Sequence, residues 1–420
     1  MKPVTVAIAG CGSRGQDTYA ACQERFGDRM QIVAAADIRP EKLRQMQKRF
    51  GLTPAQCYSS AESMLQDGKI ADVMFICTPD RMHYSEAMEA LRLGYHLLLE
   101  KPIAPTPRQC LDIEREATQR GLHVAVCHVL RYTVFYQTLK QLIDEGRVGE
   151  VVSIQAIERV AHWHQAHSFV RGNWRNAGLS TPMILQKCCH DMDILLWLCA
   201  KRCLRVSSFG SLRHFNAQNA PAGAPERCTD GCPAADTCPY NAERFYLGKL
   251  HSNQTDWPLN VLTTEFTEEA VLEALHHGPY GRCVYRCDND VVDHQVVNLE
   301  LEDGVTINFT MCAFTKDCAR HLRIMGTAGE IVADMQQNTI DVLPFMGENE
   351  HIDVTTLTSD FSGHGGGDAR LLEDFLDLVQ QTGRSKALTS ITHSVESHLA
   401  ALAAEESRLN AGRVVELNQL

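Results

Sequence analysis

The 420-residue sequence predicts an α/β domain with a doubly wound parallel sheet at residues 1–128, followed by an α+β domain at residues 129–420 with helices and an open, mainly antiparallel sheet. Continuous apolar runs alternate with helical patterns up to residue 128, which is typical of parallel strands covered on both faces. After about residue 290, strand patterns follow one another directly, and this indicates antiparallel pairing.

Charge and composition exclude several partners. The net charge is −12 and no basic run is present, so we expect neither nucleic-acid binding nor attraction to an acidic membrane. No apolar run is long enough to cross a bilayer, and residues 1–3 lead directly into the first expected strand, without a signal peptide. We therefore expect a cytoplasmic protein whose 17 cysteines are mostly buried free thiols.

The first domain consists of repeated strand–helix units. Five apolar runs predict its strands, at residues 4–9, 31–36, 72–77, 95–99 and 122–127. A helix is expected from Pro40 to just before Gly51, and further helices at residues 82–93 and 106–120. Because the carboxyl ends of parallel strands meet at one edge of the sheet, polar residues that follow these strands should share one crevice.

The second domain has a different pattern. Its first elements are expected in the order helix, strand, helix, at residues 133–145, 151–157 and within 182–198. Strand patterns at 294–301 and 305–314 flank Asp303-Gly304, which is a hairpin signal. Residues from about 211 to 290 form a cysteine-containing insert that begins with an irregular stretch, and the chain ends in helices.

The first strand runs into a glycine-rich turn, Gly10-Cys11-Gly12-Ser13-Arg14-Gly15. The spacing G-x-G-x-x-G between a strand and a helix is the fingerprint of a Rossmann dinucleotide-binding domain, in which the glycines permit a tight turn and a close approach of the pyrophosphate. Asp37 ends the second strand, where a carboxylate accepts the ribose hydroxyls of NAD. We expect NAD rather than NADP, although Arg39 offers an alternative partner for the extra phosphate of NADP.

Residues that follow the later strands complete the expected cofactor site. They are Thr78, Pro79, His83, Glu100 and Lys101. A lysine at such a strand end can hold a substrate oxygen and relay its proton; a solvated loop lysine is the alternative.

The chain resembles the glucose–fructose oxidoreductase / inositol dehydrogenase / MocA family over nearly its whole length, because four motifs occur in that family's order and spacing. The motifs are Gly10–Gly15, Cys77-Thr78-Pro79-Asp80, Glu100-Lys101-Pro102, and His190 with Asp193 before an apolar helix. The resemblance implies NAD(P)-dependent hydride transfer at a sugar or polyol carbon, with Lys101 and His190 as catalytic residues. It also implies a carbohydrate or glycoside substrate and a homo-oligomer formed through the C-terminal sheet.

One position departs from the family pattern. Many members have an aspartate four residues before the histidine, where this chain has Gln186, which cannot accept a proton. Three alternatives could replace the missing aspartate: Lys101 and His190 could act alone, Asp191 or Asp193 could be the acid, or a metal ion could take part. Cys188, His190 and His128 are the ligands considered for that ion.

The remaining substrate candidates lie around a loop at residues 158–176 that is rich in histidine and tryptophan. Such a loop suits a sugar, although a structured surface loop is the alternative. Within it the family places a Trp-Arg pair beside the cofactor, which Trp174-Arg175 matches. His364 precedes three glycines and Asp368 at the start of a late helix. This segment is expected either to contact the substrate or only to cap the helix. The expected substrate-binding residues are His128, Tyr132, His164, His167, Gln186, Asp193 and His364.

The insert contains five cysteines in two groups. Their spacing is C-x3-C-x5-C and C-x3-C, at Cys228, Cys232, Cys238, Cys283 and Cys287. Four of them could hold a structural zinc ion, which would stabilise a loop without its own core. An iron–sulfur cluster and unrelated free thiols are the alternatives.

Two activities fit these residues. The first is a dehydrogenase that acts on a free sugar or polyol. The second is a redox-neutral glycosidase, in which oxidation of a ring carbon allows elimination, water adds, and the hydride returns so that NAD is recycled; the resemblance admits it because some branches of the family work in this way. A non-catalytic NAD-binding sensor is a third reading, disfavoured by the presence of Lys101 and His190.

Overall fold

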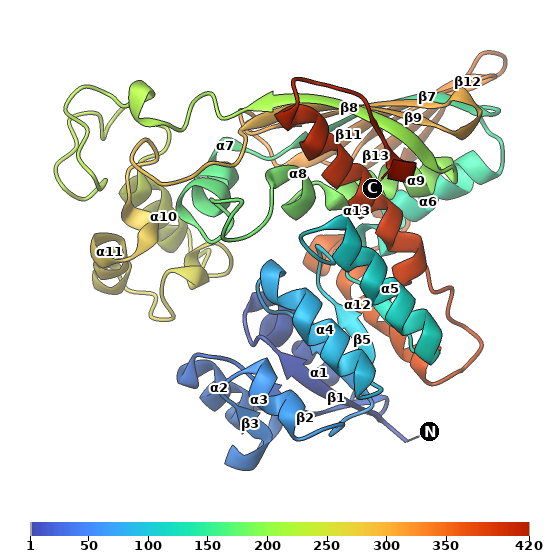
Figure 1. Cartoon of the computed structure of the whole chain (residues 1–420). Coiled ribbons are helices and arrows are strands. Elements are labelled where there is room, and N and C mark those ends of the chain that lie inside the picture. The colour runs from blue at the N-terminus through green and yellow to red at the C-terminus, as the bar shows by residue number, and fades with distance from the viewer. Residues whose placement is uncertain (1, 420) are drawn as a thin grey trace.

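The computed structural model describes residues 2–419 and contains two sheets joined by helices (Figure 1). The first is a six-stranded, all-parallel sheet in the order β3-β2-β1-β4-β5-β6. Its strands are β1 (Val4–Ala9), β2 (Met30–Ala36), β3 (Cys57–Tyr58), β4 (Val73–Ile76), β5 (His96–Leu99) and β6 (Val124–Val126). The doubly wound domain is confirmed; only the two-residue β3 has no counterpart among the predicted strands.

The helices of this domain begin and end as their capping residues dictate. Residues 13–26 form a continuous helical stretch of π, 3-10 and α turns that ends in α1 (Gln23–Phe26). Thr106 caps α5 by accepting the Gln109 N–H, and Gly121 ends it in the left-handed conformation. The other helices are α2 (Pro40–Phe50), α3 (Ala61–Gln66), α4 (His83–Arg92) and α5 (Pro107–Arg120).

The second sheet has nine strands in the order β14-β13-β12-β11-β7-β10-β9-β8-β15. All neighbours are antiparallel except β7 and β10, which run parallel. The predicted hairpin at Asp303-Gly304 joins β9 to β10. The strands are β7 (Val151–Arg159), β8 (Cys203–Ser211), β9 (His294–Leu301), β10 (Thr306–Cys312), β11 (Ala319–Gly326), β12 (Gly329–Asp334), β13 (Thr339–Pro344), β14 (Glu350–Asp353) and β15 (Val415–Glu416).

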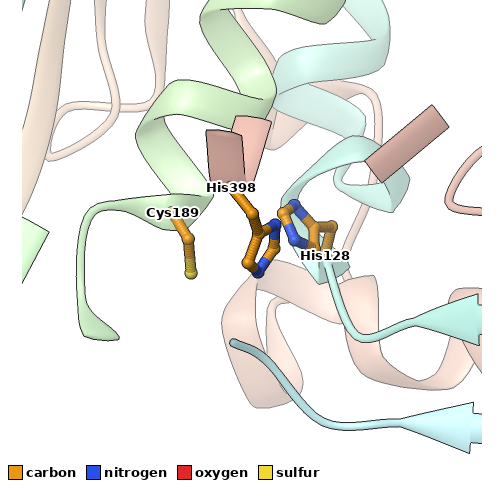
Figure 2. Close-up of side chains that lie close together, drawn as sticks. All are labelled: His128, Cys189 and His398. Carbon is orange, nitrogen blue, oxygen red and sulfur yellow. The ribbon is translucent and has the colours of Figure 1, made fainter. Parts of the chain in front are cut away.

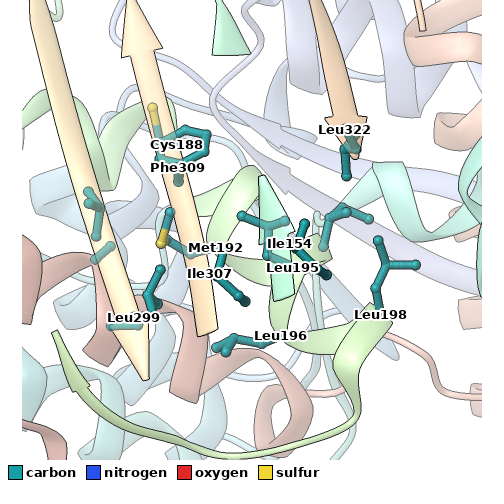
Figure 3. Packing of buried hydrophobic residues seen from close by; sticks show 14 of the residues in the cluster. Ile154, Cys188, Met192, Leu195, Leu196, Leu198, Leu299, Ile307, Phe309 and Leu322 are labelled. Atoms are coloured by element: carbon teal, nitrogen blue, oxygen red, sulfur yellow. The ribbon is translucent and has the colours of Figure 1, made fainter. Parts of the chain in front are cut away.

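Helices cover one face of this sheet. Alternate residues of β10, such as Ile307 and Phe309, are buried against Met192 and Leu195 of α9 (Figure 3). The covering helices are α6 (Val134–Asp144), α8 (Met183–Gln186), α9 (Cys189–Cys199) and α13 (Ile391–Leu409). The other face stays open, as the alternation of buried and exposed positions along the strands shows.

The C-terminal helices return to the first domain. In α12 (Ser362–Val379), Leu371 and Phe375 pack in the same core as Val6 of β1. The start of α13 belongs to the other core of the parallel sheet, whereas its second half is buried against the nine-stranded sheet. The end of the chain therefore fastens the two domains together.

The insert between β8 and β9 projects to one side in Figure 1 and carries α10 (Ala242–His251) and α11 (Glu268–His277). These helices share a small apolar core of their own. The insert is thus less irregular than its composition predicts. Beside it lie α7 (His162–His164) and a π-helical turn at Gln165–Arg171. Within the described residues, no helix has the length and apolar character needed to span a membrane.

Candidate active site at the junction of the two domains

The glycine-rich turn has the shape that a pyrophosphate requires. Gly10 has a φ of +87°, and a Cβ there would lie 2.5 Å from the Cys77 carbonyl oxygen. A Cβ at Gly15 would lie 1.9 Å from the Gly10 oxygen, so only glycine fits there. At Gly12 the nearest atom to a Cβ is 3.9 Å away, which leaves this backbone open to a ligand. The turn therefore fits a dinucleotide.

Asp37 lies at the end of β2 beside this turn. Its Oδ2 accepts the Cys11 N–H at 2.8 Å and its Oδ1 accepts the Arg39 N–H at 2.9 Å. Burial opposes ionisation, but the hydrogen bonds from Arg39 and Cys11 outweigh it and lower the pKa of Asp37. Arg39 already pairs with this carboxylate, at 3.1 Å.

Arg14 links three elements around the site. Its guanidinium donates to Glu100 Oε1 at 2.5 Å and to Asp368 Oδ1 at 2.6 Å. It also keeps Glu100 ionised, because its charge outweighs the burial that would raise the pKa of this carboxyl. Glu100 Oε2 in turn accepts the Lys101 N–H at 3.0 Å. Arg14 and Glu100 were expected to contact the cofactor; in this structure their charged groups bind each other and α12.

Lys101 reaches from the first domain to the second. Its Nζ donates to the Gln186 carbonyl oxygen at 2.7 Å. Gln186 ends α8, four residues before His190 in the first turn of α9. The amine and the imidazole are therefore brought to one junction by backbone that belongs to different domains. The Lys101-Pro102 peptide bond is cis.

His190 is 6% exposed, and its Nδ1 is buried without a hydrogen-bond partner among the described residues. Burial, reinforced by the charge of Lys101, holds the pKa of His190 well below its usual range. The ring is consequently neutral near pH 7. Its centroid lies 5.8 Å from that of His128 and 6.2 Å from that of His364.

His364 approaches His190 from a tight turn at the start of α12. Residues 363–366 all have positive φ, and His364 itself has 44°. Its Nδ1 lies 3.1 Å from Asp368 Oδ2, the carboxylate that also binds Arg14. Burial opposes ionisation of Asp368, but Arg14 and His364 outweigh it and lower its pKa. His364 thus has a charged partner and a partly exposed ring.

His128 and Asp193 lie beneath the site rather than in it. His128 is fully buried, and its Nδ1 lies 2.8 Å from Asp193 Oδ1. Both carboxylate oxygens of Asp193 accept hydrogen bonds from Arg131, each at 2.7 Å. Arg131 and His128 outweigh burial and lower the pKa of Asp193 to about 2. In this structure both residues lie behind the ring of His190, and their expected role in substrate binding stays a prediction.

The three ligands considered for a catalytic ion, Cys188, His190 and His128, do not form a metal-binding group in the described chain. Instead His128, Cys189 and His398 lie within 4.8 Å of one another (Figure 2), the only group of this kind in the described chain. His398 Nε2 already accepts the Ile103 N–H at 2.9 Å, and its Nδ1 lies 3.0 Å from the Ser394 oxygen. The lone pair that a metal would need is thus in use, and Cys188 is buried in the apolar core (Figure 3).

The candidates at the end of β4 also have protein partners. Thr78 donates its hydroxyl to Glu86 Oε2 at 2.5 Å. His83 Nε2 lies 2.9 Å from the Thr78 carbonyl oxygen and Nδ1 lies 2.7 Å from that of Pro102. These contacts leave no free ring nitrogen for a cofactor, so His83 joins the ends of β4 and β5. Pro79, which follows Thr78, has an extended backbone just before the turn Asp80–Met82.

Tyr132 and His167 are held by hydrogen bonds to other protein side chains. The Tyr132 hydroxyl donates to Asp374 Oδ2 at 2.7 Å. His167 is 2% exposed, hydrogen-bonds Tyr246 at 2.7 Å and stacks on Tyr280 with centroids 4.6 Å apart. Both side chains thus have protein partners in this structure, and their expected contact with substrate stays a prediction.

His164 keeps a place near the site. Its ring contacts Trp257 at 4.9 Å between centroids, and its Nδ1 lies 3.5 Å from Cys318 Sγ. Burial, followed by the charges of Lys187 and His167 and then that of Lys101, holds the pKa of His164 well below its usual range. This histidine is therefore also neutral near pH 7.

The loop that contains Trp174-Arg175 is fixed from two sides. Arg175 donates to both oxygens of Asp288 in the insert, at 2.7 and 3.1 Å. On the other side, Ser180 donates its hydroxyl to Asp80 Oδ2 at 2.5 Å. Trp174 packs against the core of the second domain. The sequence marks Asp80 only as part of a motif and does not mark Asp288, because nothing in the local sequence indicates a partner about 100 residues away.

A buried ionic network under α9 was also missed. Lys187 Nζ lies 3.1 Å from Glu158 Oε1, and Arg320 bridges Glu158 at 3.0 Å and Asp191 at 2.7 Å. Burial raises the pKa of Asp191 to about 6, against the opposing effect of Arg320. Asp191 is thus bound to Arg320, as Asp193 is to Arg131, and neither takes the place of the missing aspartate.

Four of the five insert cysteines line one cavity of about 20 Å³: Cys228, Cys232, Cys238 and Cys283. The fifth, Cys287, is turned away, with its Sγ 3.3 Å from the Cys283 carbonyl oxygen. No disulfide joins the cysteines of the described chain, and 7 of the 17 are buried, fewer than the mostly buried set that the sequence predicts.

Comparison with known families identifies the chain. Residues 4–128 match the model described as oxidoreductase family, NAD-binding Rossmann fold, and residues 140–417 match that described as oxidoreductase family, C-terminal alpha/beta domain. The protein belongs to the Gfo/Idh/MocA oxidoreductase family and is an NAD-binding oxidoreductase.

Its curated relatives are distant. The putative oxidoreductase YteT of Bacillus subtilis is 22% identical, with 88% of this chain and 87% of that protein covered. D-glucoside 3-dehydrogenase of Escherichia coli is 30% identical over 36% of this chain and 41% of its own length. Inositol 2-dehydrogenase/D-chiro-inositol 3-dehydrogenase of Lactiplantibacillus plantarum is 26% identical over 53% of this chain and 59% of its own length. The matches to the two dehydrogenases thus span about half of those proteins.

Solved structures share the whole fold. An inositol dehydrogenase homolog from Azotobacter vinelandii complexed with NAD+ has a TM-score of 0.71 and 14% identity, with 99% of this chain and 97% of that chain covered. An oxidoreductase from Agrobacterium radiobacter in complex with NAD+, L-tartaric acid and magnesium has a TM-score of 0.68 and 16% identity, with 99% of each chain covered.

Proposed function

We propose that the protein transfers a hydride between a sugar or polyol carbon of a carbohydrate and the nicotinamide of NAD, with Lys101 and His190 as the catalytic residues. The observation that carries the proposal is the hydrogen bond from Lys101 Nζ to the Gln186 carbonyl at 2.7 Å. It joins the end of a nucleotide-binding strand to the segment that positions His190. Relatives named as glucoside and inositol dehydrogenases support a carbohydrate substrate.

The two side chains have complementary tasks. When bound, the nicotinamide accepts the hydride from the carbon that carries the reacting hydroxyl. The ammonium of Lys101 donates a hydrogen bond to the hydroxyl oxygen and stabilises the negative charge that develops there. The neutral ring of His190 accepts the hydroxyl proton, as a general base must. Gln186 can orient the substrate only through its amide, since it takes up no proton.

The state of Asp37 supports NAD over NADP. An ionised carboxylate at this position accepts two ribose hydroxyls and repels a phosphate. Arg39 is the cation that would have to bind that phosphate, and it is paired with Asp37.

One observation favours the redox-neutral glycosidase as a second function. Elimination and water addition need more proton transfers than oxidation alone, and the junction offers a second acid–base pair. His364 lies 3.1 Å from Asp368 with its ring close to His190. A pair of this kind could protonate a leaving group while His190 serves the oxidation step.

A single incubation separates the two functions. The purified protein is mixed with sugars, polyols and aryl glycosides, with and without added NAD, and NADH and released aglycone are both measured. Stoichiometric NADH from a free sugar or polyol, without aglycone, supports the dehydrogenase. Aglycone release without net NADH shows the glycosidase. If no carbohydrate yields either NADH or aglycone, the proposal is overturned.

A further inference from the structure

The four-cysteine cavity is built by two loops that pair with each other. The Cys228 N–H donates to the Gly281 carbonyl at 2.9 Å, and the Cys283 N–H donates to the Glu226 carbonyl at 2.8 Å. This pairing brings cysteines from distant parts of the insert to one place. Cys232 and Cys238 complete the lining from the loop that follows Cys228. Proline and alanine form most of the other apolar lining. The cavity borders a small apolar cluster to which Cys283 belongs and against which Cys232 and Cys238 pack.

A buried cation faces the same cavity. Arg171 is 2% exposed and is one of the lining residues. Its guanidinium donates to the carbonyl oxygens of Arg282 and Tyr240, both at 2.7 Å, and to Cys228 Sγ at 3.7 Å. No carboxylate of the described chain pairs with it. Because a buried charge without a counter-charge is strongly unfavourable, this arginine indicates that negative charge belongs in the cavity.

We propose that Cys228, Cys232, Cys238 and Cys283 bind one structural metal ion of the zinc type as four thiolates, with Arg171 as the counter-charge. Four thiolates around a divalent ion carry a net charge of about −2. One buried guanidinium offsets half of it and donates a hydrogen bond to a ligand sulfur, as outer partners of metal ligands commonly do. Metal binding would release the four thiol protons, because the thiolate is the form that binds the ion.

The dimensions favour a single ion. The cavity of about 20 Å³ has room for one ion or water rather than for a cluster of irons and sulfides. No three of its sulfurs lie within 4.8 Å of one another in the described chain. Zinc–sulfur bonds of about 2.3 Å place tetrahedral ligands about 3.8 Å apart, so binding would draw the two loops together. Cys287 is excluded, because it does not line the cavity.

The site also bears on the reaction. Arg282, whose carbonyl binds Arg171, pairs through its guanidinium with Asp288 at 2.8 Å. Asp288 is the residue that binds Arg175 in the loop expected beside the cofactor. The metal therefore has a positioning role: it fixes the insert that supports this loop.

The experiment uses the full chain and zinc itself as the probe. Wild type, Cys238→Ser and the matched control Cys287→Ser are reconstituted with zinc, dialysed, and analysed by inductively coupled plasma mass spectrometry. We expect about one zinc per chain in wild type and Cys287→Ser, and less than about a tenth of that in Cys238→Ser. A strong chelator should lower the melting temperature of wild type and of Cys287→Ser only.

Cobalt reconstitution of wild type gives a second readout that does not depend on a variant's folding. Thiolate-to-cobalt charge-transfer bands with a tetrahedral ligand-field spectrum support the site. Wild type that retains no zinc and shows no such bands overturns the proposal. Equal loss of zinc in Cys287→Ser, disulfides among the four cysteines, or iron with acid-labile sulfide in their place would each overturn it as well.

Discussion

At the scale of single residues, the site depends on side chains whose protonation state is fixed by their surroundings. His190 is neutral because it is buried beside the charge of Lys101. Asp37 is ionised because backbone and guanidinium donors surround it. The residue types at these positions could be predicted from the sequence. Their partners could not: the residues that bind Arg14 and Asp193 come from other segments and have no local signal.

Asp37→Ala should relax the choice of cofactor. Loss of the carboxylate removes its repulsion of a 2′-phosphate and frees Arg39 to bind that phosphate. We expect kcat/KM for NADP relative to NAD to rise by about tenfold or more, which corresponds to about 1.4 kcal/mol. Asp72→Ala provides the control, since Asp72 binds Thr5 at the opposite end of the strands. An unchanged ratio in Asp37→Ala would remove this residue from cofactor selection.

Stability should fall as the pH is lowered from 7 to 5. Burial lowers the pKa of His398 from 6.5 to about 3, so between these values the unfolded chain binds a proton that the folded chain does not. The folded state therefore loses about 2 kcal/mol at pH 5 through this residue. Urea unfolding of wild type and His398→Gln at both pH values measures it. The variant should show the smaller decrease, and equal decreases would contradict the assignment.

At the scale of elements, the alternation of strands and helices in the first domain and the hairpin at β9–β10 could be predicted from periodicity and turn residues. Two features could not. The two-residue β3 is too short to leave a pattern. The helices of the insert have weak apolar periodicity and lie among proline-rich loops. The sequence predicts substrate contact for both His164 and His167 of the loop at residues 158–176, whereas in the structure these histidines divide between the junction and the insert core.

The packing of α9 on the second sheet should contribute strongly to stability. Leu195 is 2% exposed in the core shown in Figure 3. Leu195→Ala should lower the free energy of unfolding by about 2–5 kcal/mol, because it leaves a cavity under the helix that carries His190. Val152→Ala is the matched control on β7, where the side chain is 50% exposed, and should change it by less than about 0.5 kcal/mol. Similar effects in both variants would contradict this packing account.

At the scale of the whole molecule, the second sheet leaves one face uncovered by its own chain. Gln155, Asn308 and Asn298 are neighbours on adjacent strands and are exposed on that face. The family resemblance implies subunit contacts on this sheet, and the structure leaves the exposed face free to form them. The sequence could not predict how α12 and α13 fasten the two domains, because amphipathic helices do not specify which core they enter.

We expect the protein to be a homo-oligomer through this face. Multi-angle light scattering should give a mass at least twice the 46.8 kDa of one chain. Asn308→Arg, which adds a charge in the middle of the face, should shift the protein toward the monomer, whereas Arg108→Glu on the exposed surface of α5 should not. A monomer in wild type would contradict the expectation.

The central claim is that Lys101 and His190 support hydride transfer from a carbohydrate carbon to NAD. The most direct measurement uses sugars and polyols that carry deuterium on their carbon atoms. Mass spectrometry then follows the deuterium into the reduced nicotinamide, in wild type, Lys101→Ala and His190→Ala. The account predicts labelled NADH in wild type and a decrease in rate of about 10²- to 10⁴-fold in each variant, with NAD binding retained. Absence of label in wild type with every substrate, or undiminished transfer in the variants, would contradict it.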